Sequence, residues 1–235
     1  MLGSELRQQM KTNPSILGMN EPKGVKGSKR PTILSFVVDW ANLVTLLGLA
    51  SGMLSLYFAL DGQFQAAILA LLWAVLFDWF DGPIARRMRG RTEEQKLFGM
   101  KMDSLVDAIS SATVPGVLLI AYADFSPWFY PGVLAIVMAG VLRLAHFDVY
   151  GVDKDGTIAG ISMDFTPLAI AGLFLLEGLV SHDTFAGLFY GTVLLMAFLH
   201  VAPFRMQKLS GVWVPIVTGY VLVLTTAHSM ILWAD

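Results

Sequence analysis

The chain has 235 residues, of which 55% are hydrophobic and only 14% charged, and its formal net charge is −2. A soluble domain carries about a quarter charged residues, so this composition excludes an ordinary soluble protein and predicts an integral membrane protein. The sequence contains no cysteine, which excludes disulfides, thiolate zinc sites and cysteine nucleophiles.

The first 31 residues are polar, with scattered Lys, Arg, Gly, Pro and Asn. We interpret residues 1–31 as a cytoplasmic or interfacial arm and residues 32–235 as a single transmembrane catalytic domain. The arm does not resemble a signal peptide, because no apolar core follows an early basic cluster.

Windows of about 20 apolar residues indicate membrane helices along the rest of the chain. We place them near residues 36–60, 64–89, 97–121, 128–147, 164–181, 185–203 and 211–233. The predicted fold is an all-α integral membrane bundle of about seven transmembrane helices, within a range of six to eight.

The distribution of Lys and Arg distinguishes the two sides of the membrane. All 16 Lys and Arg fall on one side of the membrane, in the N-terminal arm or at alternate links between spans. The links on the other side contain Asp61, Asp124 and Asp183 but no basic residue. The positive-inside rule therefore predicts a cytoplasmic N-terminus in an inner membrane of the bacterial or archaeal type.

Four aspartates occupy the second and third expected spans: Asp78, Asp81, Asp103 and Asp107. A carboxylate at membrane depth costs a few kcal/mol or more, and it is retained where it is paired, metal-bound or facing a polar cavity. Spacings of three and four place each pair on one face of a helix. Consecutive helices with a short link are antiparallel neighbours, so we expect the four carboxylates to converge in the cytoplasmic half of the bundle.

The neighbouring residue types suit a phosphorylated ligand. Carboxylate oxygens are hard ligands for Mg²⁺, Mn²⁺ or Ca²⁺, and two such ions about 4 Å apart could clamp a diphosphate. Gly82, Ala85 and Gly99 are small enough for a ligand to approach the backbone, and Arg86 can bind a phosphate in bidentate fashion. The alternative interpretation is an ordinary loop mouth with salt bridges, such as one between Asp78 and Arg86.

The whole string resembles the signature of the CDP-alcohol phosphotransferase family, D-x-x-D-G-x-x-A-R followed by G-x-x-x-D-x-x-x-D. Every fixed position is present, from Asp78 to Arg86 and, after twelve residues, from Gly99 to Asp107. The resemblance implies transfer of a phosphatidyl group from CDP-diacylglycerol, or of a phosphoalcohol from a CDP-alcohol, with release of CMP. It also implies a homodimer.

The resemblance assigns roles by position. Two divalent ions, Mg or Mn with Ca also possible, would be held by Asp78, Asp81, Asp103 and Asp107. Asp107 would also be the catalytic base that deprotonates the acceptor hydroxyl. The CDP-binding residues would be Asp81, Gly82, Ala85, Arg86 and Gly99, together with Asn42 and Thr45. The last two, as polar residues on a helix face, could equally bond the backbone.

Further motifs are similar to the phosphatidylserine synthase branch. They are Asn42-Leu-Val-Thr45, the Asp103-Ser104 opening, and Arg143-Leu-Ala-His146-Phe147, which resembles Arg-Leu-Ala-Arg-Phe. Four features depart from that branch. Ser110-Ser-Ala-Thr-Val-Pro115 replaces Ser-Phe-Gly-x-Ala-Pro, Gly160-Ile-Ser-Met-Asp164 replaces Gly-Leu-Pro-x-Pro, and His146 replaces the second arginine of Arg-Leu-Ala-Arg-Phe. The twelve-residue spacer is longer than usual and is similar to that of bacterial phosphatidylcholine synthases. These motifs favour L-serine as acceptor, with choline, or another reaction of the same family, as the alternative.

Two residues are candidates for the acceptor site. Arg143 could bind a carboxylate or a phosphate, or it could be an interfacial arginine whose charge reaches the water. Asp164 could bind an ammonium group, or it could cap the helix that follows. We interpret His200 and His228 as structural, and the residues 148–155 as a solvated loop.

The hypothesis is a membrane phosphatidyltransferase whose partners are CDP-diacylglycerol, a small alcohol, membrane lipids and a second copy of the chain, and not nucleic acid. A cation transporter is the alternative from another class, because intramembrane carboxylates also serve translocated ions. The one-sided position of the four aspartates disfavours it.

Overall fold

The computed structural model describes residues 31–209 and 211–234. By internal contacts the chain divides into residues 1–33 and residues 34–235, and the description below concerns the second unit. Residues 1–30 of the expected polar arm lie outside the described residues.

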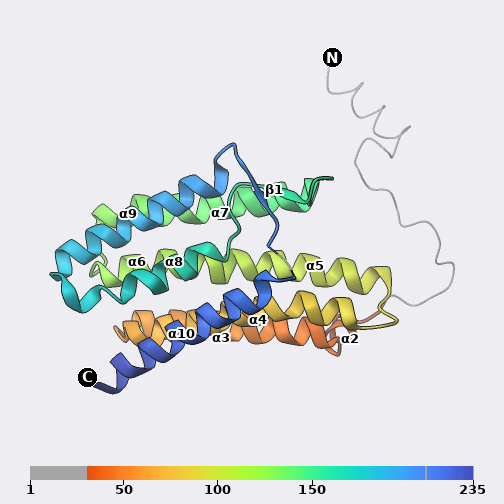
Figure 1. The fold of residues 1–235 in the computed structure, drawn as a ribbon, viewed down its shortest axis with the longest axis horizontal. Helices are drawn as coiled ribbons and strands as arrows, with labels where there is room; N and C mark the ends of the chain where they lie inside the picture. Colours follow the sequence, from red (N-terminus) through yellow and green to blue (C-terminus); the bar gives the residue numbers. More distant parts are fainter. Residues whose placement is uncertain (1–30, 210, 235) are drawn as a thin grey trace, which may run out of the picture. The chain divides into compact units, whose positions relative to one another are not determined.

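The described residues form a helical bundle with one small two-stranded antiparallel sheet (Figure 1). Its α-helices are α2 (Ile33–Val37), α3 (Trp40–Leu60), α4 (Phe64–Arg87), α5 (Glu93–Asp107), α6 (Val114–Tyr122), α7 (Tyr130–Tyr150), α8 (Phe165–Phe174), α9 (His182–Val201) and α10 (Trp213–Ala234). A π-helical turn, η2 (Ala108–Thr113), joins α5 to α6, and two 3-10 turns are η3 (Pro127–Phe129) and η4 (Glu177–Leu179). The antiparallel strands are β1 (Thr157–Ala159) and β2 (Arg205–Gln207).

Six helical segments of the described chain are long and apolar enough to cross a membrane. They are Trp40–Leu60, Phe64–Arg87, Glu93–Tyr122, Pro127–Tyr150, His182–Val201 and Trp213–Ala234. The expected span at 164–181 is a shorter apolar segment, Phe165–Leu179. Its helix α8 has 10 residues and rises only about 15 Å, roughly half of the hydrocarbon core. The all-α membrane bundle is therefore confirmed, with six full-length candidates and one short segment.

Two helix starts differ from the sequence prediction for reasons of capping. The expected span 36–60 is broken at Asp39, whose side chain accepts a hydrogen bond from the Ala41 N–H at 3.0 Å and so begins α3. The expected span 97–121 begins earlier, at Glu93, because Thr92 and Gln95 form a reciprocal capping box. Each cap satisfies backbone N–H groups that lack a partner in the first helical turn.

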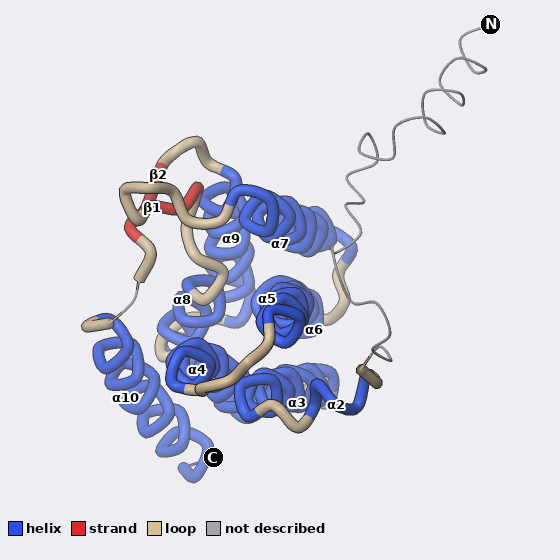
Figure 2. The backbone as a smooth tube through the Cα atoms, turned by 90° about the vertical axis from the view of Figure 1, so that its right-hand side faces the viewer, coloured by secondary structure: helices blue, strands red, loops and turns tan. Residues whose placement is uncertain are grey.

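Helices α5 and α6 form a central rod around which the other helices pack. In the end-on view, α3, α4, α7, α8 and α9 surround the rod and α10 lies outside against α4 (Figure 2). The fully buried aromatic side chains Phe174, Phe185 and Phe189 meet beside Tyr122 at the end of α6, with ring centroids of Phe174 and Phe185 5.0 Å apart. This aromatic core lies at the end of the rod opposite the aspartates.

Close backbone contacts surround the π-helical turn η2. A Cβ on Gly52 of α3 would lie 2.6 Å from Ser110 Oγ, and a Cβ on Gly140 of α7 would lie 2.7 Å from Ala112 Cβ. Because real Cβ atoms do not approach other atoms so closely, both positions need glycine. This close packing of α3 and α7 against η2 holds the segment that directly follows Asp107.

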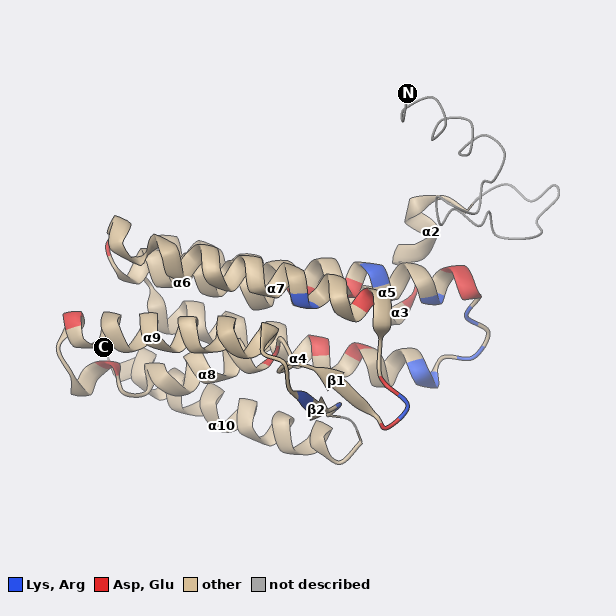
Figure 3. Ribbon diagram, turned by 90° about the horizontal axis from the view of Figure 1, so that it is seen from above, with Lys and Arg blue, Asp and Glu red and all other residues tan. Residues whose placement is uncertain are grey.

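The two-stranded sheet of β1 and β2 lies in the half of the bundle where the basic residues gather (Figure 3). Asp153, in the loop before β1, accepts a hydrogen bond from Arg205 of β2 at 2.6 Å. In the same loop, a hydrogen bond from the Thr157 hydroxyl at 2.7 Å lowers the pKa of the Asp155 carboxyl. Figure 3 shows Lys and Arg gathered toward the end of the bundle where the α4–α5 link and β2 lie. The two-stranded sheet was not predicted from the sequence.

Candidate active site

The four signature aspartates and Asp164 meet in one half of the bundle, between α4, α5 and the start of α8. Carboxylate oxygens of Asp78, Asp81 and Asp103 lie within 4.8 Å of one another, and so do those of Asp78, Asp107 and Asp164. Asp78 belongs to both groups, so the five side chains form one continuous cluster. The structure thus brings together the residues that the sequence pattern selected, and it adds Asp164 to them.

The helices explain this convergence. Asp78 and Asp81 lie in the last part of α4, while Asp103 and Asp107 lie in the last turns of α5, immediately before the π-helical turn η2. A π-helical turn contains more residues per turn than an α-helix and is common at functional sites. Here the turn follows Asp107 directly, so the last signature aspartate ends the regular α5 helix.

A cavity of about 200 Å³ opens onto the cluster. The five aspartates line it together with Arg86, Arg143, Phe147, Ile158 and Lys208, among others. Oδ1 of Asp103 is buried without a hydrogen-bond partner in the described structure, and such an oxygen is costly unless something compensates it. Hard carboxylate ligands, close spacing and an unsatisfied buried oxygen all fit divalent ions such as Mg²⁺ or Mn²⁺.

The alternative of a loop mouth with salt bridges is not supported. Within residues 31–209 and 211–234, the ion pairs with N···O distances up to 4.0 Å do not include any of the five aspartates. The ion pair of Asp78 with Arg86, which this alternative gave as an example, is therefore absent from the described structure. The acidic cluster remains available to bind cations.

A second, larger cavity of about 560 Å³ shares Asp81, Gly82 and Asp103 with the first. It extends past Asn42, Thr45, Ala85, Arg91 and Gly99. The Thr45 hydroxyl lies 2.5 Å from Asp81 Oδ2 and 3.1 Å from the Ala41 carbonyl oxygen. All seven residues assigned to CDP binding by resemblance therefore line these two cavities.

The small signature residues make room for side chains of the protein itself. A Cβ on Gly99 would lie 2.8 Å from Asn42 Oδ1 and 2.9 Å from Arg91 Nη2. A Cβ on Gly82 would lie 3.3 Å from Arg86 Nη1, so Arg86 folds back over this glycine at the edge of the smaller cavity. From the sequence we explain these glycines by the approach of a ligand. In the structure they leave space for side chains of the protein: Gly99 for Asn42 and Arg91, and Gly82 for Arg86.

Both acceptor-site candidates lie beside the aspartates. Arg143 is only 8% exposed, and its Nε donates a hydrogen bond to the Ile161 carbonyl at 2.5 Å. It is therefore a buried cavity residue and not an arginine that extends to the interface. Asp164 precedes α8 but makes no side-chain capping hydrogen bond, while the Ser162 hydroxyl donates to it at 3.3 Å. Asp164 thus stands at the N-cap position of α8, but no side-chain capping bond supports the capping alternative.

The two buried histidines have hydrogen-bond partners away from the acidic cluster. His200 lies 2.8 Å from Thr166 Oγ1, and His228 lies 2.9 Å from the Ala171 carbonyl oxygen. These contacts join α9 to α8 and α10 to α8. They support the structural interpretation of both residues.

Sequence reasoning missed four polar residues: Asp148, Arg91 and Lys208, which line the cavities, and Asp39, which pairs with Arg91. Asp148 was interpreted as part of a solvated loop, but it lies in α7, where it accepts hydrogen bonds from Lys101 at 2.5 Å and Ser104 at 2.8 Å. Lys208 lines both cavities because the pairing of β2 with β1 places the residue that follows β2 beside them. Asp39 and Arg91 form a buried ion pair beside Asn42. Of the four, only Asp39 had a signal in the sequence, as a helix-capping residue before an apolar run.

Fold and site together define a polytopic membrane protein with a polyacidic, metal-compatible cavity in one half of a helical bundle. Comparison with known families then identifies its class: the family model for CDP-alcohol phosphatidyltransferase matches residues 38–230. The chain belongs to this family.

Curated relatives include proteins named for serine lipids. Archaetidylserine synthase of Methanothermobacter thermautotrophicus is 37% identical over 148 residues, which cover 61% of this chain and 60% of that protein. CDP-diacylglycerol--serine O-phosphatidyltransferase of Mycobacterium leprae is 32% identical over 123 residues, covering 52% of this chain and 39% of that protein. The yeast Saccharomyces cerevisiae enzyme of that name is 28% identical over 185 residues, covering 68% and 65%. The chain thus spans about 60% and 39% of the first two relatives.

Proposed function

We propose that this protein transfers the phosphatidyl group of CDP-diacylglycerol to the hydroxyl of L-serine, giving phosphatidylserine and CMP. The observation that carries the proposal is the convergence of all four signature aspartates on one cavity within a chain of this family. The larger cavity beside them provides space for the nucleotide.

Serine is favoured over choline by the names of the relatives. The archaeal relative and the bacterial and yeast relatives are all named as acting on serine. A buried Arg143 beside Asp164 also suits an amino acid, whose carboxylate and ammonium need opposite charges. Choline has no carboxylate for the arginine to bind. The archaeal relative's name makes the archaetidyl counterpart of the donor a second lipid to test.

The signature carboxylates would hold two divalent ions, Mg or Mn, with Asp78 placed to serve both groups of ligands. When bound, such ions supply Lewis-acid stabilisation of charge on the diphosphate. Thr45 holds Asp81 by a hydrogen bond. Arg86, at the cavity edge, provides a guanidinium fork for a phosphate.

The chemical step is a substitution at phosphorus. The serine hydroxyl oxygen forms a bond to the β-phosphorus, the one that bears diacylglycerol, and the bond from that phosphorus to the bridging oxygen breaks. Asp107 accepts the hydroxyl proton as general base, and CMP leaves with the bridging oxygen and its electron pair. Arg143 and Asp164 orient serine so that its hydroxyl points toward Asp107, which lines the same cavity.

The membrane arrangement follows from charge. The basic residues gather toward the end of the bundle where the α4–α5 link and β2 lie (Figure 3). Arg86, at the end of α4, and Lys208, which follows β2, line the cavity of the aspartates, which supports an active site on the cytoplasmic side of the membrane. The acyl chains of the donor would remain in the bilayer while its nucleotide occupies the larger cavity. We further propose that the protein acts as a homodimer, as in the family that it resembles.

The experiment measures CMP release by the purified full chain with CDP-diacylglycerol, Mn²⁺ or Mg²⁺, and serine, choline, inositol or glycerol phosphate in parallel. We expect CMP only with divalent ions and fastest with serine, and we expect EDTA to abolish it until metal is restored. The variants Asp78→Asn, Asp81→Asn, Asp103→Asn and Asp107→Asn should each lose most of the activity. Asp183→Asn, at the exposed start of α9, is the matched control and should retain it.

The outcomes separate the alternatives. Faster CMP release with choline than with serine would replace the acceptor and leave the family chemistry intact. Full activity in all four aspartate variants would refute the catalytic assignment. Ion flux into vesicles that depends on these aspartates, without any CMP release, would favour the cation transporter.

A further inference from the structure

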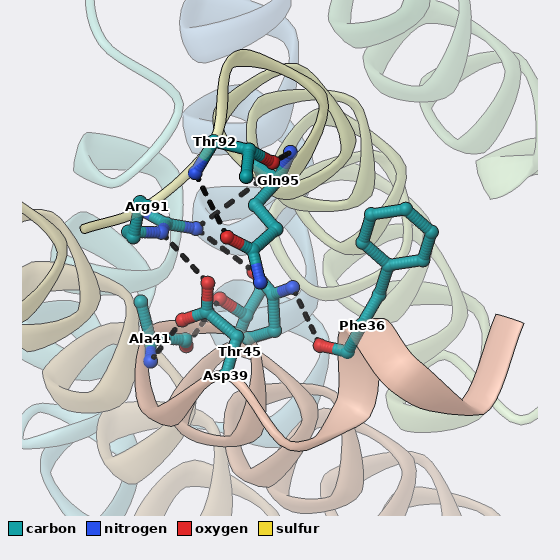
Figure 4. Close-up of polar contacts among 8 residues, drawn as sticks. Phe36, Asp39, Ala41, Thr45, Arg91, Thr92 and Gln95 are labelled. Carbon is teal, nitrogen blue, oxygen red and sulfur yellow. Dashed lines mark hydrogen bonds and ion pairs between the residues drawn. The ribbon is translucent and has the colours of Figure 1, made fainter. Parts of the chain in front are cut away.

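Asp39 and Arg91 form a buried ion pair outside the family signature (Figure 4). Arg91 Nε lies 2.7 Å from Asp39 Oδ2, and the two side chains are 9% and 1% exposed. It is the most buried of the ion pairs in the described part of the chain. Because desolvation offsets much of the attraction in such a pair, stability alone is a weak explanation for it, and its position gives a better one.

Both carboxylate oxygens of Asp39 are engaged. Oδ1 accepts the hydrogen bond from the Ala41 N–H that begins α3, and Oδ2 holds Arg91 from the link between α4 and α5. The start of one helix thereby fixes the orientation of an arginine that comes from 52 residues further along the chain. Figure 4 shows both contacts converging on this carboxylate.

The guanidinium of Arg91 reaches the wall of the larger cavity. Its Nη2 lies 3.4 Å from Asn42 Oδ1 and 3.4 Å from the Gln95 carbonyl oxygen. Asn42 is held in turn, because its Nδ2 donates to the Phe36 carbonyl at 2.8 Å. A Cβ on Gly99 would lie 2.9 Å from Nη2, so this signature glycine leaves the space that Arg91 needs. Arg91 and Gly99 line the cavity with Asp81 and Gly82.

Helix geometry indicates which part of the donor lies near Arg91. Gly99 precedes Asp103 by one helical turn of α5, a rise of about 6 Å away from the acidic cluster. With the diphosphate at the aspartates, the nucleoside extends toward Gly99. Nε of Arg91 donates to Asp39, and Nη2 donates to Asn42 Oδ1 and to a backbone carbonyl. The guanidinium is a hydrogen-bond donor only, so Nη1 provides the donors for a ligand, and cytosine and ribose offer acceptor oxygens.

We propose that Arg91 binds the nucleoside part of the CDP-lipid donor and that Asp39 is the positioning residue that aims it. This inference rests on the proposed function, because it assigns a further contact in the same donor site. It explains why a costly buried pair lies beside a signature glycine.

The primary test is Arg91→Lys, with CMP binding to the full-length purified chain measured by titration calorimetry in the presence of Mn²⁺. Lysine keeps the charge beside Asp39 but lacks the planar fork. We expect about a ten- to hundredfold loss of CMP affinity, with an unchanged Tm and unchanged Mn²⁺ affinity by electron paramagnetic resonance. Arg89→Gln is the matched control, since Arg89 is exposed in the same link, and it should bind CMP normally.

A second pair of variants separates contact from stability. Asp39→Asn should lower CMP affinity less than Arg91→Gln does, because Arg91 remains present but less well held. Arg91→Gln leaves a buried carboxylate without its partner and should lower the Tm, whereas the double variant Asp39→Asn/Arg91→Gln removes both charges and should recover it. CMP affinity should stay low in the double variant, because the guanidinium is still missing.

Three results decide the matter. Wild-type affinity for CMP in Arg91→Lys, or recovery of CMP affinity together with Tm in the double variant, would show that the pair is only structural and would overturn the inference. Absence of Mn²⁺-dependent CMP binding by the wild-type chain would refute the proposed function itself. Wild-type binding with a selective loss in Arg91→Lys supports both.

Discussion

Gly52→Ala tests the close packing that holds the π-helical turn beside the acidic cluster. The added Cβ would lie 2.6 Å from Ser110 Oγ and 3.2 Å from Ser110 Cβ, so rotation of the serine hydroxyl relieves only the first contact. Overpacking a tight interface costs about 1–3 kcal/mol, while replacing a helical glycine by alanine gains roughly 0.5–1 kcal/mol. We expect a net loss of about 1 kcal/mol in the free energy of unfolding, within a range of about 0–2.5 kcal/mol.

Gly48→Ala provides the matched control on the same helix. Its Cβ would meet Phe77 Cβ at 3.4 Å and the Ala74 carbonyl oxygen at 3.5 Å, which are ordinary contacts. It should gain the helix contribution without the clash. The difference between the two variants therefore isolates the overpacking, and it should be about 1–3 kcal/mol.

The assay is reversible unfolding in mixed micelles by increasing SDS, followed by the fluorescence of the 6 tryptophans. Ser110→Ala in the Gly52→Ala background removes the 2.6 Å contact and should restore much of the lost stability. Ser110 Oγ has no hydrogen-bond partner among the described residues, so this change sacrifices no bond there. Equal stabilities of Gly52→Ala and Gly48→Ala would refute the close approach of α3 to the turn.

Two further substitutions test the site. Thr45→Val removes the hydroxyl that lies 2.5 Å from Asp81 Oδ2, and it should raise the KM for CDP-diacylglycerol about tenfold. Thr45→Ser should restore a KM near wild type, and equal values for valine and serine would contradict a role for this hydrogen bond. Asp164→Asn should raise the KM for serine about tenfold, while the KM for the donor stays unchanged. Asp155→Asn, in the exposed loop before β1, is its control. A change confined to the donor KM would instead place Asp164 with the metal ligands, beside Asp78 and Asp107.

The sequence predicted a helical membrane bundle and the acidic half of the site because both depend on local patterns. Apolar runs of span length report membrane helices, and spacings of three and four place Asp78 with Asp81, and Asp103 with Asp107, on shared helix faces. A short link makes the two helices neighbours. These rules required no knowledge of distant contacts, and the cluster of signature aspartates follows from them.

The extent of each segment was predicted less well. The expected span at 164–181 is interrupted after ten helical residues, although its composition is as apolar as that of the full-length helices. Asp39 divides the first expected span because one side-chain hydrogen bond begins a new helix there. Hydropathy averages over such single contacts and therefore cannot locate them.

The remainder of the site was decided by tertiary structure. Arg91 reaches Asn42 and Asp39 from the α4–α5 link. Lys208 reaches both cavities because β2 pairs with β1, although the helices α8 and α9 separate these strands in the chain. Asp164 joins Asp78 and Asp107 because the short α8 begins at their level. Local spacing determined which carboxylates share a helix face, whereas packing between helices determined which distant charges face them.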